Sequence, residues 1–241
     1  MTTALIDGDI VAFRCAASCE PTKSKPALET LDDAIHRAEG LLQDLIHDVQ
    51  AKEYRLVLGG SGNFRKKICP QYKANRTAPK PTYLSAVQTY LVDHWNAVFV
   101  EGIETDDQLG IDQTAGKDTI ICSIDKDLLQ IPGTHYNFVN KEFTYVNEHQ
   151  GWVSFWKQMV MGDRSDNVMG YDGKARTTVP QFLLAVMRDL ESLDKEEAFK
   201  YVYDLYTDKD AFNLNYKLLW ILRTPEIEWP FLQEQMELVH A

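Results

Sequence analysis

The chain has 241 residues, of which 44% are hydrophobic and 11% aromatic, so it is long and apolar enough to bury a core, and the composition argues against intrinsic disorder. Its 25 Lys and Arg residues against 36 Asp and Glu residues give a formal net charge of −11, which argues against a nucleic-acid binder with a cationic surface throughout. An enzyme that acts on nucleic acid is still compatible with this charge, because net charge does not say where the charges lie.

The sequence shows neither a membrane segment nor a secretion signal. No apolar run approaches the ~18 residues of a membrane span, and residues 1–7 lack a basic stretch followed by an apolar one. The cysteines at positions 15, 19, 69 and 122 do not form paired C-x-x-C units, which argues against a zinc site. We therefore expect a cytoplasmic protein with reduced cysteines and no membrane partner.

Apolar periodicity predicts strands that alternate with helices over the first 150 residues. In chain order, the predicted elements are a buried strand at 4–7, a helix of about seven turns at 27–51, a strand at 54–58, an irregular basic segment at 64–80, a helix at 82–95, a strand at 97–100, a helix at 105–115, a strand at 118–124 and a hairpin of 136–140 with 142–146.

From Gly151 onward the sequence shows no clear strand, and apolar residues recur at helical spacing. The prediction is therefore an α/β portion at 1–150, with a mostly parallel central sheet and flanking helices, followed by a helical portion at 151–241. The aromatic residues of the last 44 positions, 198–241, are interpreted as core residues rather than as platforms for base stacking.

Carboxylates gather where the predicted strands end. The carboxyl ends of parallel strands face the crevice in which such sheets bind ligands, so we expect these acids to share one site. Acids packed together repel one another unless cations are present, and hard oxygen ligands suit Mg²⁺ or Mn²⁺. Two such ions can clamp the attacking and leaving oxygens of a phosphodiester. The acids are Asp7, Asp9, Glu104, Asp106, Asp107, Asp125 and Asp127, joined from the helical portion by Asp163 and Asp166.

Each acidic group also has a purely structural interpretation. Asp7-Gly8 could form a turn, and Asp106 with Asp107 could support a helix capped by Thr105. The acids at 125 and 127 could begin a helix, and those at 163 and 166 could belong to a polar loop. Their coincidence at consecutive strand ends favours the metal site.

A basic segment contrasts with these acids. Residues 64–80 contain six cations and no acid, and Phe64, Tyr72 and Tyr83 alternate with them. Cations bind phosphates and aromatic rings stack on bases, so the segment indicates contact with nucleic acid, whereas the structural interpretation is a solvated basic loop.

Four motifs, in this order, resemble those of the 5′–3′ exonuclease and flap endonuclease family, which includes the nuclease domain of bacterial DNA polymerase I and compact phage exonucleases. The likeness extends from Asp7 to about Val179, and the size is most similar to the phage or stand-alone type. The motifs are Tyr72-Lys-Ala-Asn-Arg76, Glu104-Thr-Asp-Asp107, Ser123-Ile-Asp-Lys-Asp-Leu-Leu-Gln130 and Gly162-Asp-Arg-Ser-Asp-Asn-Val168.

The resemblance implies a PIN-like nuclease core, a basic arch at about 64–95 and a helix-turn-helix element for duplex DNA in the helical portion. It implies two Mg²⁺ or Mn²⁺ ions and hydrolysis that leaves 5′-phosphates on DNA with 5′ ends or flaps, in the host cytoplasm if the chain is phage-encoded. We also expect RNA–DNA hybrids as substrates, because such a site would contact phosphates more than bases, and replication proteins as partners. The implied metal ligands are Asp7, Glu104, Asp106, Asp107, Asp125, Asp127, Asp163 and Asp166. Lys73, Arg76, Asp7 and Asp125 would be catalytic, and Arg65, Lys66, Lys67, Tyr72, Lys73, Arg76, Lys80, Gly170, Gly173, Lys174 and Arg176 would contact DNA.

Two departures from the family pattern bear on these roles. Many relatives carry an acid after the second strand, whereas Leu58-Gly-Gly-Ser61 has none, so one metal ion would be held more weakly or through water. Asp9 is either a substitute for that acid or a surface residue. The duplex-binding turn at 168–176 keeps the family pattern only in part, which puts a K⁺ site there in doubt.

Two other functions compete with the nuclease. Asp7-Gly-Asp9 after a strand, together with the motif at 162–167, also resembles haloacid-dehalogenase-type phosphatases, but that interpretation leaves the motifs at 72–76, 104–107 and 125–127 unexplained. The second competing function is a structure-specific DNA-binding protein that has the same fold but weak catalysis. It is considered because no acid follows the second strand at residues 58–61.

Overall fold

The computed structural model describes residues 1–240, with side chains described through Leu238. The chain forms two compact units. The sheet unit contains Met1–Asn63, Ala78–Lys126 and Gly133–Tyr145, and the helical unit contains Phe64–Thr77, Asp127–Pro132 and the chain from Val146 onward. The basic segment expected at 64–95 is therefore divided, because 64–77 belongs to the helical unit and 78–95 to the sheet unit.

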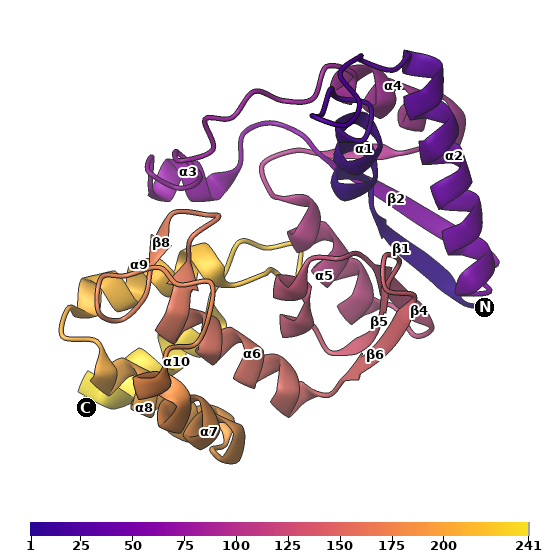
Figure 1. The fold of residues 1–241 in the computed structure, drawn as a ribbon. Coiled ribbons are helices and arrows are strands. Elements are labelled where there is room, and N and C mark those ends of the chain that lie inside the picture. The colour runs from indigo at the N-terminus through magenta and orange to yellow at the C-terminus, as the bar shows by residue number, and fades with distance from the viewer. Residues whose placement is uncertain (241) are drawn as a thin grey trace. The chain divides into compact units, whose positions relative to one another are not determined.

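The sheet unit is built on a six-stranded sheet with the order β3-β2-β1-β4-β5-β6 (Figure 1). The pairs β1–β2, β2–β3, β1–β4 and β4–β5 are parallel, which confirms the predicted mostly parallel sheet. Only residues 138–141 connect β5 to β6, too short a link for a parallel crossover, so these neighbours form the predicted hairpin. The strands are Thr3–Asp7 (β1), Glu53–Gly59 (β2), Val98–Val100 (β3), Thr119–Cys122 (β4), Gly133–Asn137 (β5) and Glu142–Val146 (β6).

Helices cover both faces of this sheet. Ala4 and Ile6 of β1 share a buried cluster with residues of α1 (Gly8–Ala17), α2 (Leu31–Asp48) and α4 (Leu84–Trp95). Leu5 lies between them and is also buried, and α5 (Thr105–Ala115) packs against β1, β2 and β4. Because successive side chains of a strand point to opposite faces, α5 covers the other face. The strand positions 4, 5 and 6 thus form the centre of the core.

Helix α1 was not predicted, and the helix at 27–51 was predicted too long. Positions 10–13 of α1 are all apolar, so the segment lacks the polar face that marks an amphipathic helix, and Phe13 remains 53% exposed. Helix α2 begins only after Thr30, whose hydroxyl accepts the Asp33 N–H while the Asp33 carboxylate accepts the Thr30 N–H. This capping box fixes the start of the helix.

The helical unit contains mostly short helices around an aromatic core. Phe155, Trp156, Phe199 and Phe212 are buried with edge-to-face contacts among them, such as the 5.4 Å between the ring centroids of Phe199 and Phe212. The elements are α3 (Phe64–Ile68), a 3₁₀ turn at Lys126–Gln130, α6 (Glu148–Met161), β7 (Gly162–Asp163), β8 (Val168–Met169), a 3₁₀ turn at Gln181–Leu183, α7 (Leu184–Ser192), α8 (Lys195–Leu205), α9 (Lys209–Leu219) and α10 (Pro230–His240).

The expectation of no strand beyond residue 151 was wrong, because β7 and β8 pair antiparallel. With two residues each they are too short to show an alternating pattern in the sequence. Among the aromatic residues of positions 198–241, Tyr203, Phe212 and Trp220 are buried in the core, as predicted.

None of the helices within residues 1–240 has the length and apolar character needed to cross a membrane.

Two helical glycines provide a test of the close packing of α1 on the sheet. A Cβ atom at Gly8 would lie 2.5 Å from the Val57 carbonyl oxygen of β2, whereas a Cβ at Gly40 in α2 would meet nothing within 4 Å. We expect Gly8→Ala to lower the free energy of unfolding by about 1–3 kcal/mol through overpacking. Gly40→Ala should raise it by about 0.5–1 kcal/mol through helix propensity. Urea titration followed by circular dichroism measures both, and a Gly8→Ala protein as stable as the parent would contradict this packing.

Candidate functional site

In the sheet unit, Asp7 and Asp125 are connected across the ends of β1 and β4. Strand order reverses between these two strands, since β2 and β3 lie on one side of β1 and β4 and β5 on the other. The Ser123 hydroxyl donates to Asp7 Oδ2 at 2.9 Å and accepts the Asp125 N–H at 3.0 Å. Ligands of open parallel sheets bind at such a reversal, so these two acids lie at the edge of the sheet where the site is predicted. Ser123 was missed by the sequence analysis, although it lies within a quoted motif.

Asp7 is buried, with 2% of its surface exposed, and it also caps α1 by accepting the Ile10 N–H at 3.1 Å. Burial raises the pKa of its carboxyl group to about 7, because the charged form loses its solvation. The hydrogen bonds from Ile10 and Ser123 oppose this shift, and the charges of Asp9 and Asp125 add to it. The Asp-Gly pair at the end of β1 is thus the start of a helix rather than a turn.

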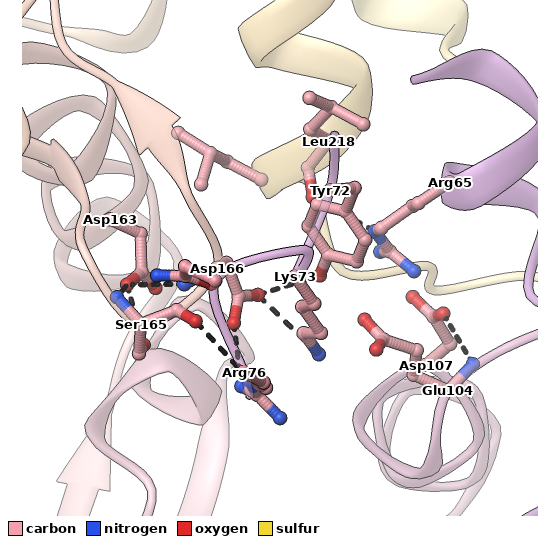
Figure 2. A network of polar contacts seen from close by, with 12 residues as sticks. Arg65, Tyr72, Lys73, Arg76, Glu104, Asp107, Asp163, Ser165, Asp166 and Leu218 are labelled. Atoms are coloured by element: carbon pink, nitrogen blue, oxygen red, sulfur yellow. Dashed lines mark hydrogen bonds and ion pairs between the residues drawn. The ribbon is translucent and has the colours of Figure 1, made fainter. Parts of the chain in front are cut away.

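The three acids before and within the first turn of α5 have different surroundings. Asp107 is fully buried, and its carboxylate accepts the Glu104 N–H at 3.0 Å in a capping box (Figure 2). Glu104, not Thr105, is the N-cap of α5, which corrects the prediction for Thr105. The structural interpretation is confirmed for Asp107, whereas Glu104 and Asp106 are half-buried.

Around Gly59 and Gly60, acids from other elements occupy the space after β2. Asp9 Oδ2 accepts the Gly59 N–H at 2.9 Å and the Thr105 hydroxyl at 2.6 Å. Glu101, which the sequence analysis missed, accepts the N–H and hydroxyl of Ser61, and these bonds lower the pKa of its carboxyl group. The region is therefore acidic although residues 58–61 carry no acid.

In the helical unit, Asp163 and Asp127 lie close enough to share a hydrogen bond. Burial opposes ionisation of Asp163, but the hydrogen bonds from Ser165, Asp127 and the Asp166 N–H outweigh it, so the pKa of Asp163 is lowered. The Ser165 N–H and hydroxyl donate to Asp163 Oδ1 at 2.7 and 2.6 Å. Two acids in such contact must share a proton or neutralise their charges with a cation.

Asp166 lies among basic side chains of the segment 64–77. The Tyr72 hydroxyl donates to its Oδ2 at 2.6 Å and Arg76 donates to its Oδ1 at 2.7 Å, while Lys73 Nζ lies 3.5 Å from Oδ2 (Figure 2). The Lys73 N–H also donates to the Asp166 carbonyl at 2.9 Å. This carboxylate therefore pairs with both cations for which the family resemblance implies a catalytic role, and one positive charge is left over.

Two asparagines fix the same segment against the loop between β7 and β8. Asn75 Nδ2 donates to the Arg164 carbonyl at 2.7 Å, and Asn167 Nδ2 donates to the Gln71 carbonyl at 2.9 Å. With the contacts of Asp166, they make residues 71–76 an ordered turn on this loop. The description of 64–80 as irregular is thus incomplete, since it also contains α3.

Two predicted DNA contacts are buried and have structural partners. Arg65 is 2% exposed and donates to the Leu218 and Trp220 carbonyls at 2.8 and 2.6 Å, at the carboxyl end of α9. Tyr72 is also 2% exposed, so its ring offers no free face to a base. Phe64 is likewise buried. The sequence shows that these residues are basic or aromatic, but it does not indicate that they are buried.

Apart from Gly170, which is buried, the remaining predicted DNA contacts are partly or fully exposed. Lys66, Lys67, Lys80 and Lys174 are exposed, whereas Arg176 forms an ion pair with Asp172. Hydrogen bonds from the Gly170 N–H to the Lys174 carbonyl and from the Gly173 N–H to the Gly170 carbonyl, both 3.0 Å, close a tight turn.

Over the described residues, no three His, Cys, Asp or Glu side chains are gathered closely enough to form a metal site by themselves. The chemistry of the acids nevertheless suits hard divalent cations, since every donor is a carboxylate oxygen. In the sheet unit a cation would relieve the unfavourable ionisation of Asp7. In the helical unit a cation would relieve the contact of Asp127 with Asp163.

The features that the two units share with the predicted nuclease class are an α/β sheet with acids at its strand reversal and a basic segment. Residues 2–158 match the family described as the 5′-3′ exonuclease, N-terminal resolvase-like domain. The chain belongs to this 5′-3′ exonuclease family, as its motifs predicted.

Relatives with known names or structures agree with this assignment. DNA polymerase I of Borreliella burgdorferi is 28% identical over 93% of this chain, which spans 27% of that relative's length. Among solved structures, bacteriophage T5 flap endonuclease in a pseudo-enzyme-product complex with DNA and metal ions has a TM-score of 0.60 at 16% identity, covering 100% of both chains. A mutant of the T5 5′-exonuclease has a TM-score of 0.57 at 16% identity, covering 99% of this chain and 98% of the other. These structures share the fold.

The buried carboxyl group of Asp7 predicts an unusual pH dependence. In the unfolded chain it releases its proton near pH 3.8, whereas the folded protein retains it up to about pH 7. Between these values its contribution to the free energy of unfolding therefore falls as the pH rises, by a few kcal/mol in the absence of metal.

Asp7→Asn should remove this contribution. Urea unfolding in EDTA at pH 5 and pH 8 should show that the variant gains stability relative to the parent at the higher pH, and the comparison cancels the other titrating groups. An equal difference between the two proteins at both pH values would contradict the raised pKa.

Proposed function

We propose that the chain is a divalent-metal-dependent 5′–3′ exonuclease and 5′-flap endonuclease that hydrolyses phosphodiester bonds of duplex DNA and leaves 5′-phosphates. The observation that carries this proposal is the Asp7–Ser123–Asp125 link at the strand reversal of a 5′-3′ exonuclease family member. RNA–DNA hybrids are included among the substrates, because a site built on phosphate contacts does not read the bases.

The proposed ligands of Mg²⁺ or Mn²⁺ ions are assigned within each unit separately. Asp107 and Asp166 are left out, because the first caps α5 and the second is paired with Lys73 and Arg76. When bound, the ions supply an activated water and stabilise charge on the phosphate. The proposed ligands are Asp7, Glu104, Asp106 and Asp125 of the sheet unit and Asp127 and Asp163 of the helical unit.

Substrate binding is assigned to the helical unit. Lys73 and Arg76 are cations held in place by Asp166, so they are oriented before a phosphate arrives. Lys66, Lys67 and Lys174 are exposed cations of the same unit and would contact phosphates of the duplex, with Arg176, Gly170 and Gly173 beside Lys174. The proposed helix-turn-helix element lies in this part of the chain.

A catalytically weak DNA-binding protein is the second candidate, because no acid stands at Gly59 or Gly60. It would bind branched DNA without turnover. A phosphatase of the haloacid-dehalogenase type is disfavoured by the family assignment.

The decisive experiment is incubation of the protein with an end-labelled 5′-flap duplex, with Mg²⁺, with Mn²⁺ and with EDTA. We expect short 5′-phosphorylated products with either metal ion and none in EDTA. Asp125→Ala, expected to bind the flap without cutting it, controls for contaminating nucleases. Binding without products in every buffer would establish the second candidate instead.

Lys73→Ala tests the assignment of that cation to the substrate. Loss of one charge-assisted contact of about 1.5–3 kcal/mol predicts a roughly 10- to 100-fold lower rate of cleavage. Lys117, an exposed residue of the sheet unit, provides the matched control as Lys117→Ala. Single-turnover rates on the flap duplex measure both, and equal rates for the two variants would remove Lys73 from the site.

A further inference from the structure

We propose that Asp9 is the positioning residue of the acids in the sheet unit, holding them for metal binding through hydrogen bonds and not as a metal ligand. This inference rests on the proposed function, since it concerns the metal ions of that site. It also decides between the two interpretations that the sequence left open for Asp9, because the residue is neither a substitute ligand nor a surface residue.

The contacts of Asp9 connect the elements that carry the acids. It is the second residue of α1, two positions after Asp7. Its Oδ2 accepts the Gly59 N–H at the end of β2 and the Thr105 hydroxyl in the first turn of α5, at 2.9 and 2.6 Å. Its Oδ1 faces Gln88 Nε2 of α4 at 3.4 Å. The Asp9 carboxylate thus connects α1, which follows Asp7, to the first turn of α5, which contains Asp106.

The space around Asp9 explains the missing acid after β2. A Cβ atom at Gly59 would lie 2.8 Å from Asp9 Oδ2 and 3.3 Å from the Thr105 hydroxyl oxygen. The Asp9 carboxylate therefore occupies the volume that a side chain at position 59 would need. A Cβ at Gly60 would similarly lie 2.5 Å from Glu101 Oε1. A Cβ at Gly60 would also lie 2.6 Å from the Val100 carbonyl oxygen, so the backbone of β3 excludes a side chain there, whereas at Gly59 the side chains of Asp9 and Thr105 fill the space.

The hydrogen bonds also show why Asp9 acts through its neighbours. A carboxylate oxygen has two lone pairs in its plane, and those of Oδ2 are engaged by the Gly59 N–H and the short Thr105 O–H. Thr105 is buried, so its hydroxyl has no water to replace Asp9. The amide oxygen of an asparagine can accept the same two donors, whereas a metal ligand would need the negative charge.

Four variants distinguish a positioning role of Asp9 from a role as a metal ligand. Asp9→Asn keeps the acceptor and removes the charge, and Asp9→Ala removes both. Thr105→Val removes the hydroxyl donor at nearly constant volume, and Thr105→Ser restores it. Asp44→Asn is the control for the loss of one acidic charge, because Asp44 is exposed on α2. Mn²⁺ binding is measured from the electron paramagnetic resonance signal of the free ion, and kcat and KM are measured on the 5′-flap duplex.

We expect Asp9→Ala and Thr105→Val to weaken Mn²⁺ binding by about tenfold or more, as is usual when a residue that orients metal ligands is lost. Both should lower kcat with little change in KM for DNA. Asp9→Asn, Thr105→Ser and Asp44→Asn should bind Mn²⁺ within about twofold of the parent.

The proposal is overturned if Asp9→Asn loses Mn²⁺ binding as severely as Asp9→Ala, since the charge would then be essential, or if Asp9→Ala binds like the parent. If Asp9→Ala fails to fold, the Mn²⁺ affinities of Thr105→Val and Thr105→Ser test the proposal instead. Equal affinities of these two variants would then overturn it. A parent protein that binds Mn²⁺ but cuts no DNA would contradict the proposed function alone, because the order of Mn²⁺ affinities still tests Asp9. A parent that binds no Mn²⁺ would overturn both.

Discussion

The burial of Asp7 at the end of β1 is the constraint on which the sheet unit depends. The same carboxyl group caps α1, accepts the Ser123 hydroxyl at the end of β4 and lies at the reversal of strand order. A buried acid of this kind is unfavourable by itself, which is why its pKa rises to about 7. Its hydrogen bonds keep it in one orientation, and the sheet around it is arranged so that Asp125 is connected to it through Ser123.

One acid pairs with two cations in the helical unit, which leaves a local positive charge in a chain with a net charge of −11. Asp166 pairs with Lys73 and Arg76 within a turn that Asn75 and Asn167 fix on the loop after β7. The carboxylate makes the same kind of contact with these cations as a phosphate group would. Cations held in this way lose less conformational freedom on binding than mobile lysines, so few of them are needed.

The sequence was a good guide to the sheet and a poor one to the partners of individual side chains. Strand positions followed from short apolar runs, and the acids after β1 and β4 followed from where those runs end. Arg65, Tyr72 and Asp9 were misjudged or left open because their partners are distant in sequence, as with Asp9 and Thr105, which lie 96 positions apart. Basic or acidic character is visible in a pattern, whereas burial depends on contacts that only the folded chain forms.

The burial of Arg65 has a consequence for the order of events during synthesis. Its two carbonyl acceptors, at Leu218 and Trp220, follow it by 153 and 155 residues. The guanidinium must therefore stay solvated until α9 has emerged from the ribosome, more than 150 residues after Arg65 itself. The segment 64–77 belongs to the helical unit, although sheet-unit residues precede and follow it in the chain. Folding of the helical unit thus includes a non-local step that follows the synthesis of α9. A chain that stops before Leu218 leaves the Arg65 guanidinium without the two carbonyl acceptors that it needs when buried.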